Sequence, residues 1–139
     1  LFKTKKRVYR RYLETVLESL DAPYQYDTVA HIGYIAHGAP YRDKLLRYKD
    51  FPKEIDAILN GIIARGKALE INFHHDMAPQ RDIIERYYEL GGRKISYGSD
   101  AHRGDICKNF DEACKMLKEI GFTHLSTFVK HEEVPVPIE

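Results

Sequence analysis

Hydrophobic residues recur at two spacings along this chain, and the two spacings alternate. Spacings of three and four residues are typical of helices with one buried face, whereas alternate positions are typical of strands. The helical spacing predicts helices over residues 3–20, 52–66, 79–91 and 109–121. The alternating spacing predicts strands over residues 26–32, 68–73 and 124–130, and one more within 94–102 that stops near Gly98. The tail, 134–139, carries two prolines and is predicted to be irregular.

Strands that alternate with helices predict an α/β fold with a parallel sheet and right-handed crossovers. Polar residues lie where three of the strands end, namely His31, then the run from Glu70 to Asp76, then Asp100 and His102. Sites in parallel sheets form at the carboxyl ends of the strands. These groups are therefore expected to converge on a metal or an acid/base site.

Asp100 and His102 are the most specific candidates for metal ligands in this hypothesis. They lie two residues apart, so on an extended backbone they point to the same side. A carboxylate beside an imidazole suits Zn, Mn or Fe. In the alternative interpretation, Asp100 caps the following turn and His102 is a surface residue.

Composition narrows the possible partners. The chain has 139 residues, a net charge of +1 and ordinary hydrophobic content. Six basic residues cluster between Lys3 and Arg11, and they are interpreted as the solvated face of the first helix. No basic field argues for nucleic acid or a membrane, and no apolar run is long enough to cross a bilayer. Cys107 and Cys114 lie seven residues apart and are read as reduced thiols of a cytoplasmic protein.

Other common sites are absent from the sequence. No glycine loop of the GxGxxG or Walker type occurs, and neither does a GxSxG elbow. Neither cysteine has an obvious histidine partner. His37 follows the first predicted strand and is read as a surface residue, with metal or substrate contact as alternatives. His124 and His131 are expected to be structural or exposed.

Several motifs then resemble one family in the same order. GSDAH at 98–102 resembles the last motif of the PHP (polymerase and histidinol phosphatase) superfamily. YDTVAHI at 26–32, the passage from 48 to 72 that ends in LEIN, and NFDEA at 109–113 are similar to its histidinol-phosphatase branch. The first helix is similar as well, so the resemblance covers nearly the whole chain.

This resemblance implies a distorted (β/α)7 TIM-like barrel with two or three divalent metal ions (Zn, Mn or Fe) at the strand ends. His31, Asp100 and His102 match family metal ligands, while Glu70 and Asn72 match a strand that supports the ligands or lines the pocket. The family's HxH pair has no counterpart here. Residues 1–139 thus resemble only the carboxyl-terminal half of the barrel, and the amino-terminal half is expected in the same gene product or a companion chain.

The implied reaction is hydrolysis of a phosphate monoester, most simply histidinol phosphate to histidinol and phosphate in histidine biosynthesis. His102 is a candidate proton donor to the leaving alkoxide. The family's phosphate-binding arginine after EIN is missing, so Arg103 or Arg81 is expected to replace it, and His74 and His75 are candidate substrate contacts. The alternatives are a phosphoesterase or nuclease of the same superfamily, and a non-catalytic fragment without a complete metal site.

Overall fold

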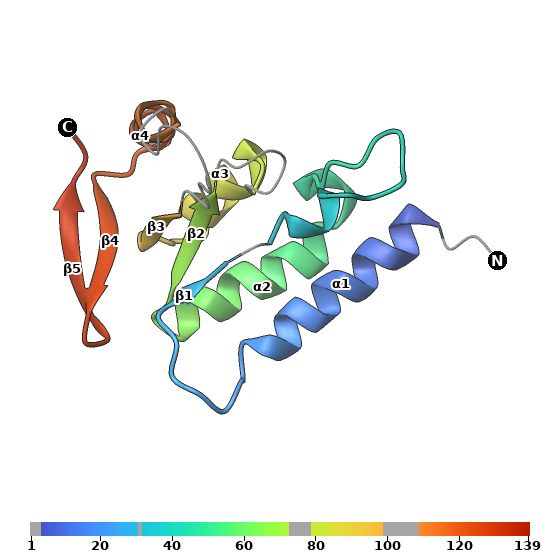
Figure 1. The fold of residues 1–139 in the computed structure, drawn as a ribbon, viewed down its shortest axis with the longest axis horizontal. Helices are drawn as coiled ribbons and strands as arrows, with labels where there is room; N and C mark the ends of the chain where they lie inside the picture. The colour runs from blue at the N-terminus through green and yellow to red at the C-terminus, as the bar shows by residue number, and fades with distance from the viewer. Residues whose placement is uncertain (1–3, 31, 73–78, 99–108) are drawn as a thin grey trace.

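A computed structural model describes residues 4–30, 32–72, 79–98 and 109–139 (Figure 1). Helices and strands alternate along most of this length, as the hydrophobic pattern predicts. The helices are α1 (Lys5–Ser19), α2 (Pro52–Ala64), α3 (Arg81–Glu89) and α4 (Phe110–Ile120), with short 3-10 turns η1 (Tyr34–Ala36) and η2 (Tyr48–Asp50). The strands are β1 (Thr28–Val29), β2 (Ala68–Asn72), β3 (Ile95–Gly98), β4 (His124–Val129) and β5 (Glu132–Pro137).

The first three strands form a parallel sheet in the order β1-β2-β3. Thr28 is aligned with Ala68 at the β1–β2 pairing. Four pairs join β2 to β3, from Leu69 opposite Ile95 to Asn72 opposite Gly98. The predicted α/β fold with parallel strands and intervening helices is therefore confirmed, and all three strands end on the same edge of the sheet.

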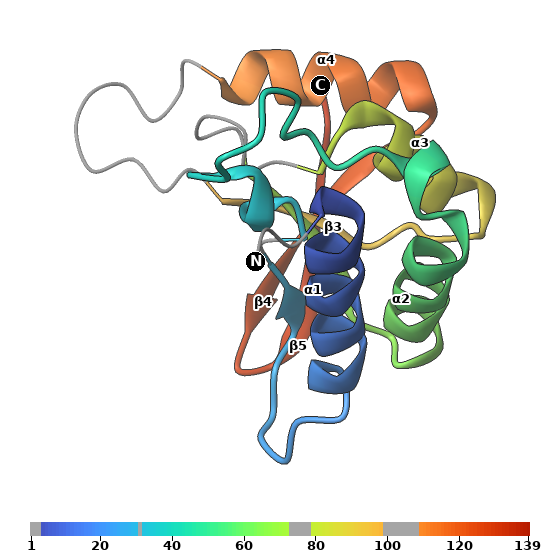
Figure 2. The same cartoon turned by 90° about the vertical axis from the view of Figure 1, so that its right-hand side faces the viewer.

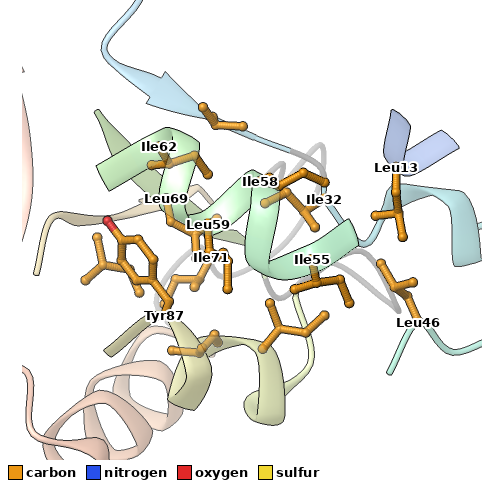
Figure 3. Packing of buried hydrophobic residues seen from close by; sticks show 14 of the residues in the cluster. Leu13, Ile32, Leu46, Ile55, Ile58, Leu59, Ile62, Leu69, Ile71 and Tyr87 are labelled. Atoms are coloured by element: carbon orange, nitrogen blue, oxygen red, sulfur yellow. The ribbon is translucent and has the colours of Figure 1, made fainter. Parts of the chain in front are cut away.

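One face of this sheet packs against α2 and α3 (Figure 3). Leu69, Ile71 and Ile95 on the strands are fully buried there. Figure 3 shows Leu69 and Ile71 among the helix residues Ile58, Leu59, Ile62 and Tyr87. Each such aliphatic side chain contributes about 1.5–3 kcal/mol by leaving water, so this layer fixes how the sheet sits on its helices.

Tyr87 adds a polar anchor to that layer. Its hydroxyl donates to the Lys94 carbonyl at 2.7 Å, just before β3 begins. Burial raises the pKa of Tyr87 to about 12, so the hydroxyl stays a donor across the physiological range. The bond ties α3 to the start of β3.

Helix α1 lies beside α2 and holds the segment that follows β1 (Figures 1 and 2). Thr4 caps the helix by accepting from the Arg7 amide. The hydroxyl of buried Tyr9 donates to the Lys44 carbonyl, and the Lys5 ammonium donates to the Leu45 carbonyl at 3.0 Å. These hydrogen bonds attach the segment between η1 and η2 to α1.

The sequence-based prediction for the end of the chain is wrong in two respects. Strand β4 lies where the sequence predicts it, but it pairs antiparallel with β5 rather than joining the parallel sheet. The expected irregular tail forms β5. Pro135 and Pro137 fit this strand because it is an edge strand, where a missing N–H is tolerated. Figure 1 shows the hairpin, in red, at the opposite end of the molecule from α1.

The hairpin turn explains how the chain reverses. Lys130 and His131 form a two-residue loop with φ angles of 50° and 66°. Positive φ at both positions is what a type I′ turn requires, usually with Asn-Gly. Neither residue prefers that conformation, so the sequence gives no turn signal here.

Asn109 is the residue before α4, and its side chain makes no capping hydrogen bond to that helix. Among the described residues, no helix has the length and apolar character needed to cross a membrane.

An ion pair between α2 and α3 supports the helical layer. The Arg86 guanidinium donates to both carboxylate oxygens of Asp56, at 2.9 and 3.1 Å, and the Tyr48 hydroxyl donates to the same carboxylate at 3.1 Å. The hydrogen bonds from Arg86 hold the pKa of Asp56 below its ordinary value, against the opposing effect of burial. This stabilisation is complete above pH 4 and is lost as the pH falls through the lowered pKa.

We expect Asp56→Asn to lower the free energy of unfolding by about 1 kcal/mol at pH 7, because a charge-assisted bidentate contact is lost. The difference from the unmodified protein should shrink below about pH 4. Urea unfolding at pH 7, 5 and 3 measures both effects. Asp21→Asn, which removes an exposed partner of Arg65, is the matched control and should change little. An Asp56→Asn deficit that is constant from pH 3 to pH 7 would contradict this role.

We expect Lys130→Asn to raise the free energy of unfolding by about 0.5–1 kcal/mol, because asparagine adopts positive φ more readily than lysine. Thermal unfolding followed by circular dichroism measures the shift. A lower melting temperature would mean that the turn does not have the conformation described.

Candidate active site

The carboxyl edge of the parallel sheet is the candidate site. Strand β1 ends two residues before His31, and β3 ends two residues before Asp100. Strand β2 lies between them and ends at Asn72. Because the strands are parallel and adjacent, the segments that follow them leave the sheet at the same edge.

Glu70 is the carboxylate that the structure describes on this part of the sheet. It lies on β2 opposite Ser96 of β3, and the next pair on the same face is Asn72 opposite Gly98. A Cβ atom added to Gly98 would lie 2.8 Å from Cδ of Glu70 and 2.9–3.0 Å from its two carboxylate oxygens. The Glu70 carboxylate thus occupies the space that a side chain at position 98 would need.

Gly98 is therefore required here for close approach rather than for an unusual backbone angle. Its φ lies outside the left-handed range, unlike those of Gly66 or Gly121. A glycine within a strand often marks a close approach of another group. Here that group is a half-buried carboxylate, directed toward the strand end that leads to Asp100 and His102.

Two further polar groups lie on the same face. Asn72 is only 1% exposed, although asparagine is mostly found at protein surfaces. The hydroxyl of Ser96 is buried and has no hydrogen-bond partner in the part of the chain that the structure describes. A buried hydroxyl without a partner carries a free-energy cost of about 1–3 kcal/mol, so it marks a position where a ligand or water would be bound.

Most residues of the predicted site lie outside the described residues. They are His31, His74, His75, Asp100, His102 and Arg103. Glu70 and Asn72 are described, and both lie toward the carboxyl end of β2, on the face with Ser96 and Gly98. Within the described ranges, no three His, Cys, Asp or Glu side chains form a group that could hold a metal. A metal site at this edge would therefore draw on the segments after β1 and β3.

Arg81 has carboxylate partners on α3 and α4. Its guanidinium donates to Glu85 on the same helix and to Glu119 on α4, each at 2.8 Å. These bonds tie α3 to α4 at an exposed position. Arg81 stays a predicted phosphate ligand, but binding phosphate would require breaking one or both ion pairs.

The described histidines, His37, His124 and His131, are all exposed. His124 is exposed next to the Thr123 hydroxyl, and Nδ1 of His131 lies 3.0 Å from Asp27. The expectation that both are structural or exposed is confirmed. His37 is exposed, with its ring centroid 5.8 Å from that of Tyr34, which agrees with its interpretation as a surface residue.

Ser96 is the described site residue that the sequence analysis missed. A serine inside a strand carries no chemical signature of its own. The available signal was its register: it lies two residues before Gly98 and four before Asp100. On a strand, these positions share one face.

Comparisons with known proteins add an independent line of support. No protein-family model matches the chain. It is 37% identical over 123 residues to the probable histidinol-phosphatase of Clostridium acetobutylicum, covering 82% of this chain and 47% of that protein. It is 30% identical over 137 residues to the histidinol-phosphatase of Lactococcus lactis, covering 92% and 50% of the two chains. The probable enzyme of Thermotoga maritima is 35% identical over 123 residues, with 84% and 50% covered.

A solved structure matches the fold as well. It is the histidinol phosphate phosphatase of Lactococcus lactis, complexed with zinc, L-histidinol and phosphate. The match has a TM-score of 0.86 and 28% identity, and it covers 96% of this chain and 53% of that one.

The chain is thus related to phosphatases that share its α/β arrangement of parallel strands and helices. More narrowly, these relatives are named histidinol-phosphatase or probable histidinol-phosphatase, which confirms the resemblance carried by the sequence motifs. The chain spans about half the length of the curated relatives that it matches.

The contact between Gly98 and Glu70 can be tested by a double-mutant cycle. We expect Gly98→Ala to lower the free energy of unfolding by about 1–2 kcal/mol, because the new methyl group displaces the carboxylate. The same substitution in a Glu70→Ala background should cost about 0.5 kcal/mol or less, since the clash is gone. Urea unfolding of the four proteins gives the coupling energy. Equal costs in both backgrounds would show that the carboxylate does not lie against position 98.

Proposed function

We propose that this chain supplies the carboxyl-terminal half of a metal-dependent phosphatase that converts histidinol phosphate to histidinol and phosphate. One observation supports this most: over 96% of its length the chain matches a histidinol phosphate phosphatase that holds zinc, L-histidinol and phosphate. The proposed whole is a distorted (β/α)7 barrel, in which β1, β2 and β3 are three neighbouring strands. Its HxH-bearing amino-terminal half belongs to the same gene product or to a companion chain.

In this proposal His31, Asp100 and His102 hold divalent metal. Two imidazoles and a carboxylate form a donor set that suits Zn, Mn or Fe. The parallel alignment of β1, β2 and β3 supports their convergence, because the segments that carry them follow strands ending on one edge. When bound, such metal ions neutralise phosphate oxygens and lower the pKa of a bound water, so that hydroxide forms near neutral pH.

The other residues bind and orient the substrate. Arg103 is the preferred phosphate ligand, since a guanidinium grips two phosphate oxygens at once and Arg81 is already bonded to two carboxylates. His74 and His75 contact the organic part of the substrate. A protonated histidine, either His102 or another one that is not bound to metal, gives a proton to the leaving alkoxide oxygen, which avoids the release of a strong base.

The proposed setting is histidine biosynthesis in the cytoplasm. Cys114, a free cysteine in the described part of the chain, suits a reducing compartment. The net charge of +1 favours a small substrate over the phosphate backbone of a nucleic acid, which a basic groove would attract.

The test is an assay of the polypeptide that contains this chain, with zinc or manganese added and L-histidinol phosphate as substrate. We expect phosphate release, and at least a 100-fold lower kcat/KM for Asp100→Asn and His102→Asn. His124→Asn and Asp21→Asn, which change the same residue types at exposed positions, should retain activity. Intact mass and metal content of the same sample identify the species assayed.

Two outcomes would contradict the proposal. Hydrolysis of a short DNA strand but not of histidinol phosphate would indicate a nuclease. A protein with the mass of this chain alone, free of metal and inactive on both substrates, would indicate a non-catalytic relative.

A further inference from the structure

The face of the sheet that points away from α2 and α3 carries small and polar residues. On β2 these are Ala68, Glu70 and Asn72, and on β3 they are Ser96 and Gly98. In barrels of parallel strands, bulky branched side chains usually fill the equivalent positions. The polar side chains Glu70, Asn72 and Ser96 give this face hydrogen-bonding capacity.

Glu70 gives this face its charge. It is the one acidic residue within the described strands β1, β2 and β3. Its carboxylate lies against Gly98, within one residue pair of the carboxyl ends of both strands. A half-buried carboxylate at this place attracts a cation and would also repel a phosphate group placed directly on it.

Ser96 lies opposite Glu70 on the neighbouring strand. Adjacent strands are about 4.8 Å apart, and the Glu70 carboxylate lies against Gly98, two residues beyond Ser96 on β3. The Ser96 hydroxyl is buried without a partner in the described part of the chain. A hydroxyl can accept a hydrogen bond, so a donor bound beside Glu70 would satisfy it.

We propose that Glu70 and Ser96 form the subsite for the ammonium group of the substrate. The inference rests on the proposed function, because histidinol phosphate is the phosphate ester of an amino alcohol. The ammonium group donates one hydrogen bond to the Glu70 carboxylate and a second to the Ser96 hydroxyl. Gly98 leaves the room that lets the carboxylate reach this position. The subsite orients the substrate and selects phosphate esters that carry an amine.

The test compares two substrates that differ only in the amine: L-histidinol phosphate and the same imidazolylpropyl phosphate without its amino group. We expect Glu70→Gln to lower kcat/KM for the aminated ester about 10- to 100-fold, because the ion pair is lost. The effect on the amine-free ester should be less than threefold. Ser96→Ala should show the same selectivity with a three- to tenfold effect. Glu112→Gln, at an exposed position of α4, should change neither substrate.

Binding provides a second readout that does not depend on turnover. Calorimetry with L-histidinol alone should show at least tenfold weaker binding to Glu70→Gln than to the unmodified protein, with metal content unchanged. Glu70→Asp, which keeps the charge, should bind better than Glu70→Gln. If Glu70→Gln does not fold, the subsite is tested by Ser96→Ala alone, through its loss of kcat/KM on the aminated ester compared with the amine-free ester.

Three results would overturn the subsite. Equal losses on both esters, or a loss of metal from Glu70→Gln, would assign Glu70 to the metal or to general positioning. Unchanged kinetics on both esters would remove it from the site. An unmodified protein that neither hydrolyses the esters nor binds L-histidinol would refute the subsite together with the proposed function. Binding of L-histidinol that depends on Glu70, without hydrolysis, would support the subsite while refuting the phosphatase.

Discussion

The pairing of β2 with β3 is the interaction on which the rest of this structure depends. Its register places Leu69 and Ile71 on the face buried by helices, and Glu70 and Asn72 on the other. A shift by one residue would exchange the two faces, placing a carboxylate in the apolar layer. The hydrophobic core and the candidate site are therefore fixed by one set of backbone hydrogen bonds. Gly98 adds the local condition that lets the Glu70 carboxylate lie against β3.

The parallel core of the fold could be predicted from the sequence because its elements are locally encoded. Helices with one apolar face and short buried strands have distinct periodicities. The end of the chain could not be predicted in the same way. Strand β5 contains prolines, and its turn requires positive φ at Lys130 and His131, so the local preferences point away from a hairpin. Pairing with β4 overrides them, and pairing is a property of two segments rather than one.

The residues of the candidate site also differ in whether the sequence alone could reveal them. Residues that follow the strands could be predicted from chain order, because parallel strands bring their ends together. The family resemblance added the roles of Glu70 and Asn72. Ser96 could not be found from composition or motif, since its significance lies in its alignment with Glu70 and its unsatisfied hydroxyl. The ion pair between Arg81 and Glu119 could not be predicted either, because Glu119 lies 38 residues away on another helix.

In the proposed enzyme, the segments after β1 and β3 bring His31, Asp100 and His102 together around metal. The most direct measurement is X-ray diffraction at the zinc absorption edge from crystals of the protein grown with zinc and phosphate. We expect anomalous density at the carboxyl edge of the sheet, with nitrogen and oxygen atoms of these three residues about 2.0–2.2 Å from it. Zinc bound elsewhere, or no anomalous density at this edge, would contradict the account.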